Sequence, residues 1–229
     1  MSTTSYVIAL DGPAGAGKST VAKRVAEQLG YALVDTGAIY RSVTLLALRG
    51  GIDIDDGARL GDVARTLAEK LRFSMKAGKN TTWVGDEDVS AAIRTSEVST
   101  ASSSVSRHPE VRSALLELQR TLGRRPPGAV LEGRDIGTVV FPDADVKIFI
   151  TASAEERAKR RVKELHERGS SEDYAKVLEQ IRTRDKQDSE RALAPLKSAE
   201  GSAIVDTSGK SVDDVVKEII GLIRHTLEK

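Results

Sequence analysis

Short apolar runs alternate along the chain with longer amphipathic segments, and this alternation predicts strands and helices in turn. Residues 7–10 form an apolar run of the length typical of a buried parallel strand. The segment after it places Val21, Val25 and Leu29 at helical spacing and ends at Gly30. Four further runs have the character of strands: 31–34, 129–131, 146–150 and 203–205. The sequence therefore predicts an α/β fold in which a five-stranded parallel sheet has helices on both faces.

The segments between these runs carry the period of an amphipathic helix. Helical spacing of apolar residues predicts helices over 39–49, 60–71, 109–122 and 212–227. Residues 152–196 are strongly charged and also read as helical, with an interruption at 169–171. Residues 95–106 resemble a serine-rich linker in composition, but Val98, Ala101 and Val105 keep helical spacing and favour a helix.

One segment has the period of a strand but does not fit the alternating β/α pattern. Leu71, Phe73 and Met75 alternate with polar residues, a turn follows at 76–80, and a second strand is expected at 81–84. Residues 88–94 could complete a small antiparallel meander, which we interpret as an insertion. Its basic residues and Trp83 leave a nucleic-acid patch open, although an exposed hairpin is the favoured reading.

Composition narrows the class of protein. The formal net charge is +1 and aromatic residues are 3% of the chain, which argues against a nucleic-acid-binding module. The absence of cysteine excludes disulfides and thiolate metal sites. The N-terminal stretch lacks the features of a signal peptide, and no run approaches the ~20 apolar residues of a membrane span. We therefore expect a soluble, cytoplasmic enzyme without nucleic-acid or membrane partners, and a monomer.

The strongest chemical signal follows the first strand. Residues 12–19 read GPAGAGKS and match G-x-x-x-x-G-K-[ST] at every fixed position, between a strand and a helix. Glycines allow the backbone to turn its N–H groups towards phosphate oxygens, and the helix N-terminus adds a positive field. Lys18 can reach the β and γ phosphates, and Ser19 can hold Mg²⁺. The residues expected to bind the triphosphate of ATP are Gly12, Pro13, Ala14, Gly15, Ala16, Gly17, Lys18, Ser19 and Thr20.

Charged residues also follow the second and third strands, at the edge where ligands bind in such sheets. Residues 35–41 read DTGAIYR. Taken by themselves, they are explained by Thr36 as a helix N-cap and Arg41 as a surface residue. Because a phosphate site is expected beside them, we favour Arg41 as a ligand of a second phosphorylated substrate. Residues 132–135 read EGRD. Glu132 can orient Mg²⁺ and Arg134 can face phosphate, while a structural Arg–Asp pair is the alternative.

Two rows of arginine flank the break at 169–171. One comprises Arg157, Arg160 and Arg161, and the other contains Arg184 and Arg191 around Asp188. Charged helices usually have solvated faces. A hinged lid that brings positive charge to a moving phosphoryl group and excludes water is the alternative that we favour.

Taken together, the motifs identify the chain as a relative of a known family. Five motifs occur in one order: the glycine loop, D-T-G-A-I-Y-R, E-V-x4-S-x-V before H-P-E-V-R, E-G-R-D-I-G-T-V-V-F-P-D-A and R-x3-D-x2-R-A-x2-P-L. The sequence resembles bacterial-type cytidylate kinases from about residue 7 to the final helix. Many folds share the glycine loop, whereas the EGRDIGTVVFPDA block and the insertion are more specific.

The resemblance implies a P-loop kinase fold with a core at about 5–62 and 105–229, an inserted monophosphate-binding subdomain at about 63–104 and a helical lid at about 155–175. It implies that ATP, with Mg²⁺ held by Ser19 and Glu132, phosphorylates CMP and dCMP. The residues implied for the cytosine base are Ser103, Arg112 and Asp135, and those for the ribose are Arg184 and Asp188. The residues implied around the acceptor phosphate are Thr36, Arg41, Arg134 and Arg191. The catalytic set implied is Lys18, Arg134, Arg157, Arg161 and Arg191.

Two positions depart from the family pattern, and other functions stay open. Thr36 and Glu132 stand where familiar members carry Ser and Asp, and Glu132 leaves the metal geometry open. Another nucleoside monophosphate kinase, such as adenylate kinase, is the nearest alternative. A GTP-binding switch would need N-K-x-D, which the sequence lacks, and its one D-x-x-G match at 206–209 follows the last strand. The three histidines, at 108, 166 and 225, stand alone, which argues against zinc or serine-hydrolase chemistry.

Overall fold

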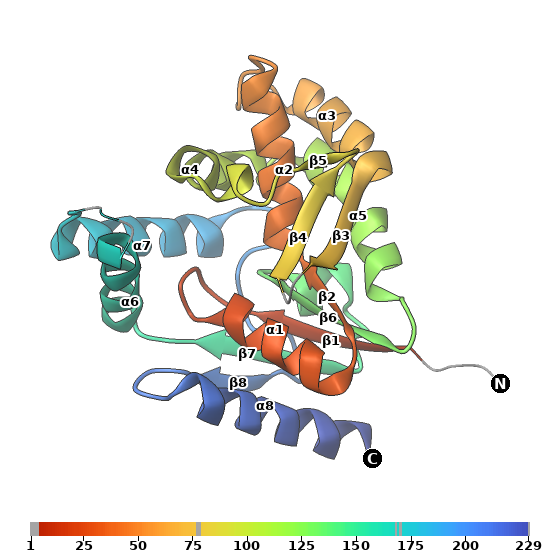
Figure 1. Ribbon diagram of the computed structural model, residues 1–229, viewed down its shortest axis with the longest axis vertical. Helices are drawn as coiled ribbons and strands as arrows, with labels where there is room; N and C mark the ends of the chain where they lie inside the picture. The colour runs from red at the N-terminus through yellow and green to blue at the C-terminus, as the bar shows by residue number, and fades with distance from the viewer. Residues whose placement is uncertain (1–4, 77–78, 168, 170, 229) are drawn as a thin grey trace. The chain divides into compact units, whose positions relative to one another are not determined.

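The computed structural model describes residues 5–76, 79–167, 169 and 171–228 (Figure 1). Residues 77–78 of the expected turn, and Ser170 of the expected break, lie outside the described residues. The chain divides into two compact units. Unit 1 comprises Met1–Leu33 and Arg124–Lys229, and unit 2 comprises Val34–Gly123.

A five-stranded parallel sheet carries the glycine loop. Its order is β2-β6-β1-β7-β8, so the first strand lies in the centre. The strands are β1 (Tyr6–Asp11), β2 (Ala32–Asp35), β6 (Gly128–Gly133), β7 (Val146–Thr151) and β8 (Ala203–Asp206). In register, Leu10 pairs with Glu132 on one side and with Ile148 on the other. The predicted α/β class and the five predicted strands are confirmed.

Two helices pack on one face of this sheet. They are α1 (Lys18–Leu29) and α8 (Val212–Leu227). Their apolar stripes, with Val25 and Ile219 fully buried, join Ile8, Leu10 and Ile148 in one hydrophobic core. Because side chains alternate along a strand, Asp11 lies on the opposite face from Leu10. The central strand is thus fixed on its apolar side by α1 and α8, while its last residue presents a carboxylate to the other side.

The charged segment of unit 1 forms two helices, α6 (Ala154–Glu167) and α7 (Tyr174–Glu190). Asp173 caps α7, because its carboxylate accepts the backbone N–H groups of Ala175 and Lys176. A short π-helical turn, η2 (Ile136–Val140), follows β6, which the sequence pattern did not predict. Within the described residues, no helix combines the length and the apolar character needed to cross a membrane.

Unit 2 contains helices and a small antiparallel sheet of order β3-β4-β5. Its elements are α2 (Thr36–Arg49), α3 (Gly57–Lys70), β3 (Leu71–Lys76), β4 (Lys79–Val84), β5 (Glu87–Asp88), η1 (Ala92–Arg94), α4 (Ser96–Val105) and α5 (Pro109–Gly123). Buried Leu45, Ile93 and Val98 form part of its core. The predicted third strand is only two residues long, and a 3₁₀ turn follows it because Ile93 packs into this core. The serine-rich segment is a helix, as its apolar spacing predicted.

Candidate functional site

The glycine loop connects β1 to α1 in a conformation that side chains would obstruct. Gly12 has φ +148°, and a Cβ there would stand 1.9 Å from the carbonyl oxygen of Ile150. Gly17 has φ +85° and caps α1 in the left-handed conformation. Glycine is required at both positions, since other residues would overlap backbone or strain it. The first N–H groups of α1 therefore open onto the loop, where a helix offers an anion its unpaired donors.

Lys18, the first residue of α1, is buried within this loop. Its Nζ donates a hydrogen bond to the carbonyl of Pro13 at 2.6 Å. Burial lowers the pKa of the Lys18 ammonium well below its ordinary value, and the Arg134 guanidinium lowers it further; Glu132 and Asp11 act in the opposite direction. A bound polyphosphate would favour the charged ammonium and raise this pKa again. Without a bound anion, the nearby carboxylates therefore do not compensate for the cost of burying the Lys18 ammonium.

Ser19 and Glu132 come together from α1 and β6. The Ser19 hydroxyl donates to Oε2 of Glu132 at 2.7 Å. Both groups supply the hard oxygen ligands that Mg²⁺ prefers, and the longer Glu132 side chain in place of Asp still reaches the hydroxyl. Among the described residues, no cluster of three or more acidic or histidine side chains could form a metal cage. This pair fits a Mg²⁺ ion that completes its shell with water and substrate phosphates.

Asp11 is a buried carboxylate that the sequence analysis did not single out. It ends β1, is 4% exposed, and accepts the N–H of Ile136 at 2.8 Å and that of Gly137 at 2.7 Å. Burial raises the pKa of Asp11 from 3.8 to about 6; the two backbone N–H groups lower it, Asp135 raises it, and Lys18 lowers it.

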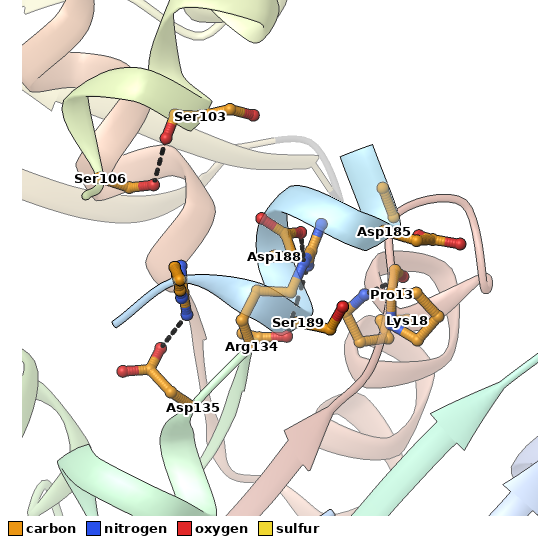
Figure 2. Close-up of polar contacts among 12 residues, drawn as sticks. Pro13, Lys18, Ser103, Ser106, Arg134, Asp135, Asp185, Asp188 and Ser189 are labelled. Carbon is orange, nitrogen blue, oxygen red and sulfur yellow. Dashed lines mark hydrogen bonds and ion pairs between the residues drawn. The ribbon is translucent and has the colours of Figure 1, made fainter. Parts of the chain in front are cut away.

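Arg134 and Asp135, between β6 and η2, are each paired with a residue at the end of α7. Nε of Arg134 donates to Oδ2 of Asp188 at 3.0 Å, as Figure 2 shows. Oδ1 of Asp135 lies 3.8 Å from a guanidinium nitrogen of Arg191, and both side chains are buried. Arg184 on α7 is close enough to Lys18 to lower its pKa. The structure thus brings together all the predicted residues of 132–135 and 184–191 within unit 1.

The arginines of α6 occupy different environments. Arg157 is 5% exposed and donates to both carboxylate oxygens of Asp185, at 2.9 and 2.5 Å. It also donates to the carbonyls of Ala152 and Ala14, the latter in the glycine loop. Arg161 is 40% exposed and donates to Glu164 at 3.2 Å. Of the two predicted arginines, Arg157 therefore contacts the glycine loop, whereas Arg161 pairs within α6.

Arg160, which lies between them, contacts a second loop. Its guanidinium donates to the hydroxyl and the carbonyl of Thr207, at 3.0 and 2.7 Å. The Thr207 hydroxyl in turn donates to the carbonyl of Ala16 in the glycine loop at 3.2 Å. This series of hydrogen bonds fixes the loop after β8 beside the glycine loop.

Within unit 2, the start of α2 gathers cations around one carboxylate. Asp35, rather than Thr36, is the N-cap, and its Oδ1 accepts the N–H of Ala38 at 2.8 Å. Arg41 donates to Oδ2 of Asp35 at 3.0 Å, and Arg94 of η1 lies 3.7 Å from the same oxygen. Nε of Arg41 is buried without a hydrogen-bond partner in the part of the chain that is described. Thr36 is buried in the first turn. The alternative that made Thr36 the cap is wrong, because the Asp35 side chain occupies that role.

The other two predicted residues of unit 2 lie on its later helices. Ser103 is in α4, and its carbonyl accepts the Ser106 hydroxyl at 3.1 Å (Figure 2). Arg112 in α5 donates to the carbonyl of Ser106 at 3.2 Å and lies 5.7 Å above the ring of Tyr40. Ser106 therefore contacts both residues and fixes their helices with respect to each other.

Sequence reasoning missed several polar residues that contact the predicted set. Among them are Asp11, Arg94, Asp185 and Thr207. In each of these cases the partner lies far along the chain or on the next helix. Asp11 directly precedes the glycine loop, and an ionisable residue ending an otherwise apolar central strand was the signal available for it.

Comparison with known proteins shows the family to which the chain belongs. A family model described as cytidylate kinase matches residues 8–225. A curated cytidylate kinase of Exiguobacterium sp. (strain ATCC BAA-1283 / AT1b) is 50% identical over 96% of this chain and 97% of its own length. The cytidylate kinase of Shouchella clausii (strain KSM-K16) is 48% identical over 96% of this chain and 96% of its own length. That of Mycobacterium leprae (strain Br4923) is 46% identical over 97% of this chain and 97% of its own length.

Solved structures support the fold. A gluconokinase from Sinorhizobium meliloti 1021 aligns with a TM-score of 0.51 and 14% identity over 97% of this chain and 94% of its own. An uncharacterized protein from Eubacterium ventriosum ATCC 27560 aligns with a TM-score of 0.52 and 14% identity over 96% of this chain and 98% of its own. At this identity the likeness shows the kinase fold alone. The family match and the curated relatives, over nearly the whole chain, show that the chain belongs to the cytidylate kinase family.

Proposed function

We propose that this chain transfers the γ-phosphoryl group of ATP to CMP and dCMP, which gives ADP and the corresponding diphosphates. The observation that carries the proposal is the buried Lys18 inside the glycine loop, next to the Ser19–Glu132 pair. Lys18 is a buried cation whose pKa is lowered by burial and by Arg134 and Arg184. Such a cation is poorly suited to stabilising the fold and well suited to binding a polyphosphate. The family supplies the identity of the acceptor.

The reaction needs positioning more than covalent chemistry. An oxygen of the CMP phosphate attacks the γ-phosphorus, and the bond from this phosphorus to the β–γ bridging oxygen breaks, so that ADP leaves. No enzyme-bound intermediate is required. Lys18 stabilises charge on the β and γ phosphates, while the loop N–H groups hold the triphosphate. Ser19 and Glu132 would hold Mg²⁺, which supplies neutralisation of the phosphate charge when bound.

The acceptor phosphate is assigned to arginines, because guanidinium groups bind phosphate in a bidentate manner. In unit 1 these are Arg134 and Arg191, whose present partners are the carboxylates of Asp188 and Asp135. In unit 2 Arg41 has the same role by family resemblance, with Thr36. Arg184 and Asp188 are assigned to the ribose, so that binding exchanges internal pairs for contacts with the nucleotide.

Base choice is assigned to Asp135. Its carboxylate can only accept hydrogen bonds, so it suits the 4-amino group of cytosine and opposes the 4-oxo group of uracil. The resemblance adds Ser103 and Arg112 from unit 2; an Arg donor facing N3 would likewise suit cytosine and oppose the N3–H of uracil. Each buried mismatch costs about 1–3 kcal/mol, which gives a preference for CMP of ~10²-fold or more.

The segment at about 155–175, which contains most of α6 and the start of α7, is assigned to a lid over ATP. Arg157 already contacts the glycine loop through the carbonyl of Ala14, and Arg161 reaches into solvent from the same helix. The net charge of +1 and the low aromatic content favour free nucleotides over nucleic acid as partners. A cytoplasmic monomer acting on these nucleotides completes the proposal.

A coupled ADP-release assay with ATP, Mg²⁺ and a panel of nucleoside monophosphates tests this function. CMP and dCMP are the expected acceptors, and UMP should be poorer by ~10²-fold. Turnover that is highest with AMP would indicate an adenylate kinase. Slow hydrolysis of GTP that does not depend on an acceptor would indicate a nucleotide-dependent switch. Either result would overturn the proposal.

A further inference from the structure

Asp11 connects the central strand to the segment that carries Arg134 and Asp135. Its two carboxylate oxygens each accept one backbone N–H, from Ile136 and from Gly137, at 2.8 and 2.7 Å. The same residue pairs in register with Gly133 through the β1–β6 ladder. Residues 134 and 135 therefore have an attachment to Asp11 on either side, at Gly133 through the strand and at 136–137 through the carboxylate.

This attachment needs an ionised carboxylate. Both of its oxygens accept, whereas an amide of the same shape has one acceptor and one donor. An amide at position 11 would direct its N–H₂ group at a backbone N–H and leave one buried donor without a partner. Such a donor costs about 1–3 kcal/mol, and the segment would shift to avoid it.

The chain keeps this charge although burial opposes it. Asp11 is on the face of the sheet away from the α1–α8 core, and burial raises its pKa to about 6. Two backbone bonds and Lys18 offset part of this cost, while Asp135 adds to it. An apolar residue would end the strand at lower electrostatic cost. We therefore look for the function of this charge in the backbone N–H groups of Ile136 and Gly137, which the carboxylate binds.

We propose that Asp11 is the positioning residue of the acceptor site: it fixes the segment 134–135 against β1, and through it the placement of the Arg134 guanidinium and the Asp135 carboxylate. The inference rests on the proposed function, which assigns these two side chains to the acceptor. Because Gly12 follows Asp11 directly, one strand end sets both the loop that binds the donor nucleotide and the segment that binds the acceptor. In this proposal Asp11 acts on the acceptor through residues 134 and 135, by its hydrogen bonds to Ile136 and Gly137.

The test is Asp11→Asn, with Asp145→Asn as the matched control. Asp145 also accepts a backbone N–H of β1, that of Val7 at 2.7 Å, but at the amino end of the strand. Both substitutions replace a carboxylate by an amide of equal size at a backbone contact of the same strand. Steady-state constants for ATP, CMP and UMP, together with the melting temperature, would be measured for the wild type and both variants.

Asp11→Asn should lower kcat/KM for CMP by ~10–100-fold, the size expected when reacting groups are displaced by about an ångström. The ratio of CMP to UMP should narrow, and KM for ATP should stay within about twofold, since the glycine loop keeps its own contacts. Asp145→Asn should change only the melting temperature. Gly137→Ala provides a second variant if Asp11→Asn does not fold. Its Cβ would lie 3.3 Å from Cβ of Ala199, which is tighter than an ordinary contact, and 3.5 Å from Oδ2 of Asp11, so the segment should shift slightly and KM for CMP should rise.

Two results would overturn the inference. In the first, Asp11→Asn behaves as Asp145→Asn does, with a lower melting temperature and unchanged constants for CMP. In the second, the constants for ATP and CMP worsen together, which would place the role of Asp11 in the glycine loop. An inactive wild-type protein would contradict the proposed function instead, so the two failures are distinguishable.

Discussion

Arg157 lies on the inner turn of α6, next to the glycine loop, and Arg161 lies on the outer turn that follows. The two arginines differ in burial and in their hydrogen-bond partners. Arg157 is 5% exposed and makes four hydrogen bonds, two to Asp185 and two to the backbone carbonyls of Ala152 and Ala14. Arg161, one turn later, is 40% exposed and bonds to Glu164, three residues away on the same helix. Spacing places both on one face of α6, so the sequence predicts one role for them. Burial against the glycine loop separates them.

The difference shows that the charged side chains of this protein fall into two groups, which differ in burial and in the distance to their partners along the sequence. At the carboxyl end of the sheet, charged side chains are buried and held by partners distant in sequence, as with Asp135 and Arg191. On the outer helices they pair locally, where an ion pair is worth about 0–1 kcal/mol. The first kind costs desolvation and is therefore expected to serve binding or catalysis.

The largest expected effect contrasts two lysines of α1. Lys18→Ala should lower kcat by at least ~10²–10³-fold, because it removes a preorganised charge from the transferred phosphates. The fold should be kept, since Lys18 is a buried cation whose lowered pKa shows that burial does not favour its charge. Lys23→Ala, which removes an exposed cation paired with Glu27, is the control and should leave kcat unchanged. Near-normal turnover of Lys18→Ala in the ADP-release assay would remove the glycine loop from the mechanism.

The next effect is on stability and tests the two arginines directly. Arg157→Ala removes the partner of Asp185, whose side chain is 29% exposed, together with the hydrogen bonds to the carbonyls of Ala152 and Ala14. The free energy of unfolding should therefore fall by about 2–4 kcal/mol. Arg161→Ala should change it by less than about 0.5 kcal/mol. Urea unfolding at pH 7 provides the measurement. Equal effects of the two substitutions would show that the distinction between inner and outer turns has no energetic basis.

A smaller effect sharpens the comparison at Asp11, where burial opposes charge. Its pKa is raised from 3.8 to about 6, so between these values the folded protein holds a proton that the unfolded chain has released. Stability therefore falls as the pH rises through this window, by about 2–3 kcal/mol for this group. Asp11→Asn does not titrate, and its stability relative to the wild type should improve by that amount between pH 4 and pH 7. Parallel curves of unfolding free energy against pH would contradict the raised pKa.

The sequence was sufficient for the parts of this molecule that are local. The glycine loop, the five strands and the order of the motifs depend on neighbouring residues, so period and spacing predicted them. The cap of α2 was harder, because Asp35 and Thr36 are both good capping residues and only the backbone shows which side chain accepts the N–H of Ala38. The π-helical turn at 136–140 has no periodic signature.

The contacts that give the site its geometry are not local. Asp11 bonds to residues 125 and 126 positions later, and Arg157 bonds to a carboxylate 28 positions later on another helix. No spacing rule connects such pairs. A single sequence therefore predicts which residues face the ligand better than it predicts the residues that hold them.

The central claim is that the buried charges at the carboxyl end of the sheet serve the acceptor nucleotide, and Asp135 tests it most directly. Asp135 lies 3.8 Å from Arg191, so a purely structural pair would explain its burial equally well. The measurement is kcat/KM of Asp135→Ala for CMP and for UMP, relative to the wild type. If Asp135 accepts from the 4-amino group of cytosine, the constant for CMP should fall far more than that for UMP, and the ~10²-fold ratio between them should narrow by ~10-fold or more. Equal loss for both substrates would assign Asp135 to the pair with Arg191 and contradict the account.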